Sequence, residues 1–195
     1  MKKLLFFVVP AILFSCDHEV ELRRSVFIPD PDAPGLPKYS EWGYNTFGAY
    51  YGRDIIVSND YEIPVQVIQQ SNSTIFKFRG QKGYYSNGFE IRLVIPDFAP
   101  STYQDVISLH QQVIDLSDEK YTIAIEEDYS THTVELLGGT FEFKRAQNLL
   151  VDGEDEEVIL SGVFEFQMVI DGEPVSITEG RFDVGVGSYN FFVLD

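Results

Sequence analysis

The chain contains few of the side chains that usually supply a base or a nucleophile at neutral pH. Its 195 residues include three histidines and one cysteine. A Ser-His-acid triad needs a histidine with an orienting acid behind it, and no Gly-x-Ser-x-Gly elbow accompanies His18, His110 or His132. We interpret His110 and His132 as structural histidines. Phosphate-binding loops of the P-loop and Gly-x-Gly-x-x-Gly types are also absent, so we expect no catalytic residues and no cofactor.

Carboxylates are the chemical group in excess, with 31 Asp and Glu against 14 Lys and Arg. Glycoside hydrolysis needs two of them about 5 to 9 Å apart, and Glu126, Glu142 and Glu165 are candidates. In so acidic a chain, outward-facing glutamates on strands are the expected solvated surface, which is the simpler interpretation. The acidic run at residues 152–157 lacks the alternating spacing of a calcium loop. We therefore expect a solvated hairpin loop there and no metal site.

The charge and the cysteine count exclude further classes of protein. A formal net charge of −17 argues against a nucleic-acid binder, which needs a basic surface. One cysteine excludes a disulfide within the chain, and one cysteine with three histidines falls short of the usual Cys/His zinc sites.

Aromatic side chains are the remaining functional signal. Several lie close to glycines, where exposed rings can stack on sugars or anchor a protein partner. The alternative is that they cap the ends of the sheets, with the rings turned inward. The candidate contacts with a glycan or an envelope protein are Trp42, Tyr44, Tyr84 and Tyr85, and Tyr50 and Tyr51 belong to the same group.

The N-terminus has the layout of a secretory signal peptide over residues 1–15. Lys2 and Lys3 precede an apolar run at residues 4–14, and acidic, polar chain follows Cys16. The run is about half as long as the roughly 20 residues of a membrane-spanning helix. We therefore exclude residues 1–15 from the folded domain.

The sequence Leu-Phe-Ser-Cys at residues 13–16 resembles the lipobox of bacterial lipoproteins. The resemblance implies lipid attachment at Cys16 and a domain anchored to the membrane by acyl chains. Asp17, Glu19 and Glu21 look like the surface-export signals of some Gram-negative lipoproteins, particularly those of Bacteroidota, or they simply keep a tether soluble. We expect an outer-membrane lipoprotein of the cell envelope, facing either the periplasm or the cell surface.

Residues 16–38 are predicted to be a lipidated, proline-rich tether. Four prolines between residues 29 and 37 favour extended chain with few ladder hydrogen bonds. The alternative is that residues 26–28 form an edge strand of the domain.

Residues 39–195 are predicted to form a single β-rich domain. Apolar and polar residues alternate in several short segments, and Asp171-Gly172 is a strong hairpin turn. The expected strands are residues 75–79, 89–95, 121–126, 140–144, 158–170, 175–178, 180–184 and 189–194. Only residues 101–109 suggest a short helix. The fold class is therefore all-β, an antiparallel β-sandwich or partly closed barrel with at most one short helix.

A Gly-x-Phe-acid-apolar pattern occurs three times, starting at Gly139, Gly162 and Gly180. The spacings of 23 and 18 residues exclude a fixed-period repeat. The pattern predicts three strands of one sheet, each with an inward phenylalanine and an outward acid.

Three segments resemble a group of Bacteroidota lipoproteins that is assigned only to a domain of unknown function. They are residues 45–50, which contain Asn-Thr-Phe-Gly, residues 139–143, and residues 177–183, which contain Thr-x-Gly-x-Phe-Asp. The resemblance spans residues 42–186 loosely. It implies a β-rich, lipid-anchored domain, and it brings no established activity. We expect a non-enzymatic binding or accessory protein with a glycan as its candidate ligand, and the alternatives are an envelope assembly subunit and a carboxylate-based glycan hydrolase.

Overall fold

The computed structural model describes residues 24–59, 63–83, 88–132 and 134–194. The predicted signal peptide, Cys16, Tyr84 and Tyr85 lie outside these ranges. The described strands are β1 (Thr46–Tyr51), β2 (Asp54–Val57), β3 (Val65–Gln70), β4 (Ser73–Lys82), β5 (Phe89–Pro96), β6 (Gln112–Asp115), β7 (Thr122–Glu127), β8 (Ser130–His132), β9 (Val134–Val151), β10 (Glu154–Ile170), β11 (Glu173–Val186) and β12 (Phe191–Val193), with a short 3₁₀ helix η1 (Tyr103–Leu109) between β5 and β6.

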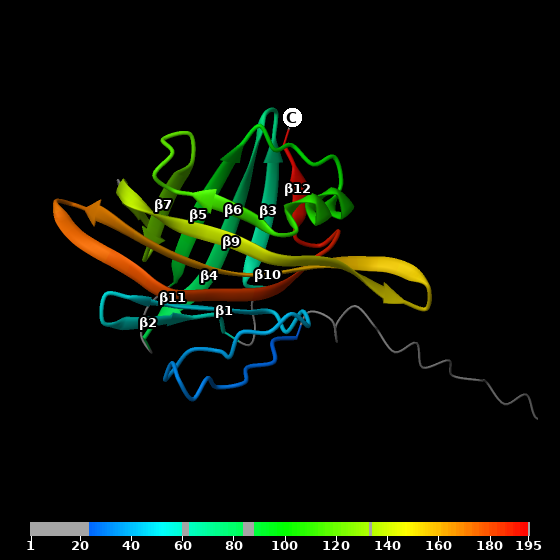
Figure 1. Cartoon of the computed structure of the whole chain (residues 1–195), viewed down its shortest axis with the longest axis horizontal. Coiled ribbons are helices and arrows are strands. Elements are labelled where there is room, and N and C mark those ends of the chain that lie inside the picture. The colour runs from blue at the N-terminus through cyan, green and yellow to red at the C-terminus, as the bar shows by residue number, and fades with distance from the viewer. Residues whose placement is uncertain (1–23, 60–62, 84–87, 133, 195) are drawn as a thin grey trace, which may run out of the picture.

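The strands form two layers that are joined through β4. One layer has the order β6-β9-β10-β11-β1-β2, and the other contains β3, β4, β5, β7 and β8. β12 pairs with β3 in parallel, and every other described strand pair is antiparallel. In Figure 1 the long strands β9, β10 and β11 cross the strands of the second layer. The sheet is open, so the all-β prediction is confirmed and the architecture is that of a sandwich.

The core lies between the layers and is built largely from phenylalanine. Phe78 of β4 contacts the first layer, with its ring centroid 5.0 Å from that of Phe182 and 5.6 Å from that of Phe47. Within the first layer, the rings of Phe141 and Phe164 stack 5.0 Å apart. All five side chains are buried. Alternation along each strand places these rings on the inner face.

The three Gly-x-Phe-acid segments lie on the adjacent strands β9, β10 and β11, as predicted. Each glycine leaves room for a ring on the neighbouring strand: Gly162 pairs with Phe182, and Gly180 with Phe164. The third acid, Asp183, alternates with the core residues Phe182 and Val184 and so lies on the outer face as predicted, but it is not solvated, because its exposure is only 1%. The chain segment that precedes β1 folds over it.

The hairpin at Asp171-Gly172 is confirmed, with positive φ angles of 51° and 85° between β10 and β11. Asp152-Gly153 makes an equivalent turn between β9 and β10, with φ angles of 53° and 88°. The prediction of an acidic loop over residues 152–157 is therefore wrong beyond Gly153. Two residues complete the turn, so Glu154 already begins β10.

The predicted strands at residues 175–178 and 180–184 are parts of one strand, β11. Glu179 has a φ of 53°, and the pairing with β10 shifts register at this point. An extra residue in one strand is a β-bulge, which bends the strand without ending it. The glycine that follows suggested a strand boundary and instead belongs to the bulge.

The predicted helix is present as η1. A capping box links Thr102 and Asp105 at its first turn, and Val106 and Leu109 are buried. No helix within the described ranges is long and apolar enough to span a membrane.

Residues 24–38 differ from the predicted tether, because they pack against the domain. Leu36 is fully buried, and Arg181 of β11 forms an ion pair with Asp30. The ring of Pro37 occupies the space that a side chain on Gly48 would fill. The edge-strand alternative is not seen either, since residues 24–28 form no strand and the segment makes one isolated bridge, between residues 29 and 37. Figure 1 shows this blue segment beneath β1 and β2.

Candidate functional site

Trp42 is exposed on a loop that a buried carboxylate holds in place. The Trp42 side chain is 73% exposed. Asp183 of β11 accepts hydrogen bonds from the backbone N–H groups of Trp42, Gly43 and Tyr44, at 3.1, 2.8 and 3.2 Å, and from the hydroxyl of Ser40. Hydrogen bonds to a charged acceptor are stronger than neutral ones. The backbone below the exposed ring is thus fixed before any ligand arrives.

The next residue secures the other end of the loop. Asn45 is fully buried and has a φ of 51°, a conformation that asparagine tolerates better than most residues. Its side-chain oxygen accepts a hydrogen bond of 2.9 Å from the N–H of Gly185. The Asn-Thr-Phe-Gly segment therefore joins the Trp42 loop to β1.

A hollow of about 340 Å³ lies beside the indole ring, and we call it the Trp42 pocket. It is lined by Tyr39, Ser40, Glu41, Trp42, Arg145 and Gln147. Hydrogen bonds among the polar groups of this pocket fix their positions. Gln147 donates a hydrogen bond of 2.8 Å to the carbonyl of Glu41, and Arg145 donates one of 2.7 Å to the side chain of Gln147. The site therefore combines one aromatic face with fixed donors and acceptors.

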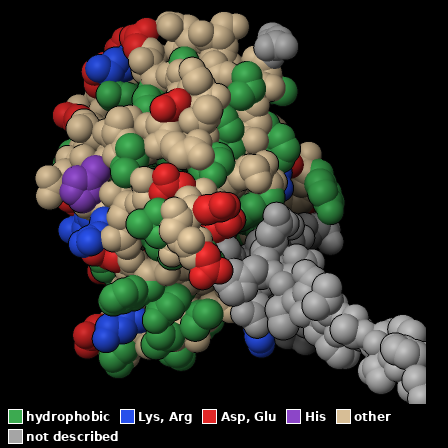
Figure 2. Space-filling view, turned by 90° about the vertical axis from the view of Figure 1, so that its right-hand side faces the viewer, with side chains coloured by type: hydrophobic (Ala, Val, Ile, Leu, Met, Phe, Trp, Pro, Cys, Tyr) green, Lys and Arg blue, Asp and Glu red, His purple; other side chains and the backbone are tan. Residues whose placement is uncertain are grey.

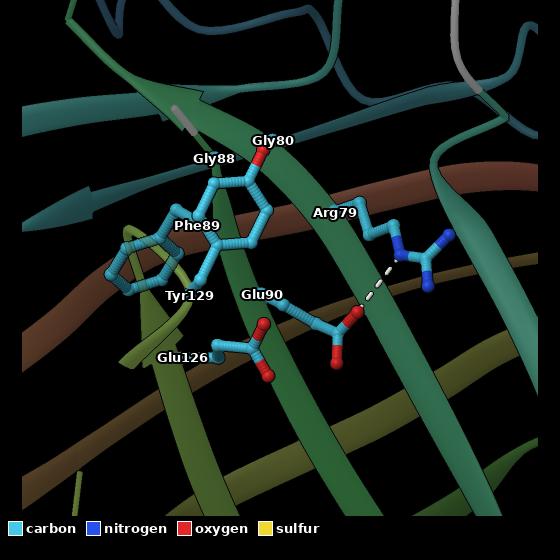
Figure 3. Close-up of a pocket in the computed structure, with 7 residues that line it drawn as sticks. All are labelled: Arg79, Gly80, Gly88, Phe89, Glu90, Glu126 and Tyr129. Carbon is cyan, nitrogen blue, oxygen red and sulfur yellow. Dashed lines mark hydrogen bonds and ion pairs between the residues drawn. The ribbon is translucent and has the colours of Figure 1, made fainter. Parts of the chain in front are cut away.

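A second hollow, of about 270 Å³, contains two facing glutamates (Figure 3). Glu90 of β5 and Glu126 of β7 lie opposite each other in the strand register. Arg92 donates hydrogen bonds to both, at 2.5 Å to Glu90, and Arg79 donates one of 2.8 Å to Glu90. Both carboxylates are therefore paired with cations.

The electrostatics of this pair do not favour acid catalysis. Burial by itself raises the pKa of Glu90, but hydrogen bonds from Arg79 and Arg92 and the charge of Lys77 outweigh it, so the pKa is lowered. A glycosidase general acid needs a raised pKa. The pair resembles an ion-pair network more closely than an acid and a base. The other candidates, Glu142 and Glu165, lie on the outer surface of β9 and β10.

The predicted aromatic group is only partly brought together. Tyr44 follows Trp42 on the same loop and is half-buried. Tyr51 packs on Phe89 at the other end of β1, with ring centroids 5.2 Å apart, and the Tyr50 hydroxyl donates to the carbonyl of Pro34. Tyr51 therefore follows the alternative interpretation, in which the ring turns inward against the core, and the hydroxyl of Tyr50 is hydrogen-bonded within the protein.

The two described histidines make structural contacts. His110 accepts a hydrogen bond of 3.1 Å from the N–H of Ala146, and His132 lies 3.0 Å from Asp171 at the β10–β11 turn. In the part of the chain that the structure describes, no three His, Cys, Asp or Glu side chains are grouped as metal ligands would be.

No protein-family model, curated protein or solved structure matches this chain. The resemblance to the Bacteroidota lipoproteins therefore stays a prediction, as does lipid attachment at Cys16. Sequence reasoning found Trp42 and missed Asp183, Arg145 and Gln147. Those three come from strands more than 100 residues later in the chain, and only the Thr-x-Gly-x-Phe-Asp segment gave any signal, for Asp183.

Proposed function

We propose that this protein is a lipid-anchored, non-enzymatic binding protein of the outer membrane that recognises a glycan through Trp42. The observation that carries the proposal is a 73% exposed indole on a loop fixed by Asp183. A rigid loop loses little conformational entropy on binding. An exposed aromatic face that is held ready therefore suits a ligand with a flat apolar face.

The chemical groups of a sugar are complementary to those of the Trp42 pocket. A pyranose ring presents C–H groups on its face, which pack on an indole, and hydroxyls on its rim, which need donors and acceptors. Glu41, Arg145 and Gln147 supply both within the same hollow. This combination of one apolar wall and few ordered polar groups is typical of small-molecule sites.

The test uses the fact that Trp42 is the only tryptophan in the chain. The purified full chain in detergent is titrated with a panel of neutral and charged oligosaccharides, and tryptophan emission and acrylamide quenching are recorded. We expect a blue shift and protection from quenching with one sugar class. Trp42→Ala should abolish that binding in calorimetry, whereas Tyr129→Ala, at an 82% exposed ring in the hollow of Figure 3, should not.

The same samples test the absence of catalysis. Chromatography of the bound glycan after long incubation should show no shortened products. Cleavage that is lost in Glu126→Gln or Glu165→Gln would instead establish the glycan hydrolase alternative.

Lipid attachment at Cys16 needs a separate test, because Cys16 lies outside the described residues. We expect radioactive palmitate to label the wild-type protein and leave Cys16→Ala unlabelled and released from membranes. Labelling of Cys16→Ala would contradict the lipoprotein assignment. Protease accessibility on whole cells then distinguishes the surface from the periplasm.

The envelope assembly subunit remains a second candidate because of β12. Among the described strands, β12 pairs with β3 alone, and Phe192 and Val193 of β12 and the following Leu194 are each at least 40% exposed. Edge strands of this kind accept a strand from another protein. A crosslinked envelope partner that is lost in Val193→Pro, together with no glycan response, would favour this function.

A further inference from the structure

A larger hollow adjoins the Trp42 pocket on the outer face of the long strands. It has a volume of about 550 Å³ and lies over β9, β10 and β11, and we call it the groove. Tyr39 lines both the groove and the Trp42 pocket. Lys144 lines the groove while its neighbour Arg145 lines the pocket, so the two hollows also meet along β9.

The side chain of Tyr39 lies between the two hollows and is held in place by hydrogen bonds. Its hydroxyl donates a hydrogen bond of 3.0 Å to Glu41 and lies 3.5 Å from the Ser161 hydroxyl. Burial of the phenol raises the pKa of Tyr39 to about 12, so the ring stays neutral at physiological pH. A second aromatic side chain is therefore held one step along the surface from Trp42.

The groove combines a small apolar floor with hydrogen-bond acceptors. Val163 of β10 is partly exposed in it, beside Thr140 and the carboxylates of Glu142 and Glu165. Carboxylates accept hydrogen bonds from pairs of hydroxyls. This lining is the same mixture of apolar and polar groups that favours a sugar in the Trp42 pocket.

The cations of the groove are already paired. Arg181 contacts Asp30 and donates a hydrogen bond of 2.7 Å to Glu179, and Lys144 lies 3.5 Å from Glu142. The groove is therefore acidic in balance, on a protein whose net charge is −17. Carboxylates are also spread over the face of the molecule that Figure 2 presents. A polyanion would meet repulsion here.

We propose that the Trp42 pocket and the groove are two subsites of one site, and that the ligand is an uncharged oligosaccharide of several sugar units. This inference rests on the proposed function and specifies its ligand. One sugar stacks on Trp42, the chain passes Tyr39, and the next units lie over Val163 with their hydroxyls toward the glutamates. Each hollow alone is within the size range of small-molecule sites, and together they exceed the needs of one sugar.

The experiment is a length series. Neutral gluco-, manno- and galacto-oligosaccharides of one to six units are titrated into the full chain, with Trp42 emission as the readout and oligogalacturonate of equal length as the charged comparison. We expect affinity to rise by about tenfold or more from the monosaccharide to the tetrasaccharide, and we expect the uronate to bind more weakly. High salt should reduce that difference, because it screens the repulsion.

Variants separate the two subsites. Thr140→Arg places a long cation in the groove at an exposed position, and it should remove the gain in affinity with oligosaccharide length. Val193→Arg, the same new side chain on β12, is the matched control and should keep that gain. Circular dichroism confirms that both variants fold.

The outcomes distinguish this inference from the proposed function. If Trp42 responds to sugars and affinity does not depend on length, or if the uronate binds more tightly, the two-subsite inference is overturned and the proposed function stands. If no sugar changes Trp42 emission, both fail.

Discussion

At the scale of single residues, Asp183 determines the geometry of the Trp42 loop. Removing its carboxylate would leave the donors of Ser40, Trp42, Gly43 and Tyr44 without their acceptor. Because buried groups that lose a partner cost about 1 to 3 kcal/mol each, we expect Asp183→Ala to lower the free energy of unfolding by roughly 3 kcal/mol or more. Urea unfolding measures this directly.

The same variant should loosen the loop in the folded state. The fluorescence anisotropy of Trp42 should fall, and glycan affinity should fall with it. Asp183→Asn keeps the shape and one acceptor oxygen, so its effects should be smaller. Unchanged anisotropy in Asp183→Ala would show that the loop is held by something other than this carboxylate.

Glu90 makes stability depend on pH in a defined direction. Its pKa in the folded protein is lower than its ordinary value of 4.5, because the hydrogen bonds from Arg79 and Arg92 outweigh burial. The unfolded chain therefore binds a proton first as the pH falls, and the stabilisation by ionised Glu90 is present above pH 4.5 and lost below it.

Glu90→Gln should accordingly be less stable than the wild type at pH 7, by about 2 kcal/mol. The difference should narrow as the pH falls below about 4.5, where the wild type loses the same contribution. Urea titrations at a series of pH values test this prediction. A difference in the free energy of unfolding that stays constant with pH would contradict it.

At the scale of elements, two glycines should respond to alanine for different reasons. Gly172 has a φ of 85° and open space around it, so Gly172→Ala should cost only about 1 kcal/mol of backbone strain. Gly162 has an ordinary φ, but an added Cβ would collide with the carbonyl of Glu142 and the ring of Phe182. Because the strands would have to separate, we expect Gly162→Ala to cost about 3 kcal/mol.

Thermal unfolding of the two variants tests the comparison. Ser176→Ala, at a half-buried position on β11 with extended backbone, serves as the control and should change stability little. Equal losses at Gly162 and Gly172 would mean that crowding between β9, β10 and β11 is not what the glycine pattern prevents.

Elements defined by local patterns were predicted well, and elements defined by distant contacts were not. Alternation located β4, β5, β7 and β12 and parts of β9, β10 and β11, and Asp-Gly located the β10–β11 hairpin, because both signals act within a few residues. The strands β1, β2, β3, β6 and β8 were not predicted. The packing of residues 24–38 depends on the burial of Leu36 and on the ion pair between Asp30 and Arg181. These contacts join positions that are far apart in the sequence and form only on folding. Proline spacing favoured a tether because it reports backbone preference and not burial.

The residues of the candidate site also differ in whether local sequence signals identify them. Trp42 was identifiable from its residue type and the glycine that follows it. Asp183 was expected to face solvent, since its strand position predicts exposure and nothing local indicates that residues 40–44 cover it. Pairing between residues about 140 apart in the chain is information that one sequence does not display.

At the scale of the whole molecule, the two layers should unfold together. β4 pairs with β2 of the first layer and with β3 and β5 of the second, and Phe78 contacts phenylalanines of both β9 and β11. We expect Trp42 emission, which reports on the first layer, and far-ultraviolet circular dichroism, which reports on both, to give coincident urea transitions. Separate midpoints would show that one layer persists without the other.

The backbone N–H of Val26 bonds to the carbonyl of Tyr44, two residues from Trp42, so the N-terminal segment meets the domain close to the exposed indole. Ten residues separate Cys16 from Val26, and even a fully extended chain of that length spans only about 35 Å. A lipid anchor at Cys16 would therefore confine the indole to a thin layer of space above the bilayer, where the ligands it meets are those that come close to the membrane.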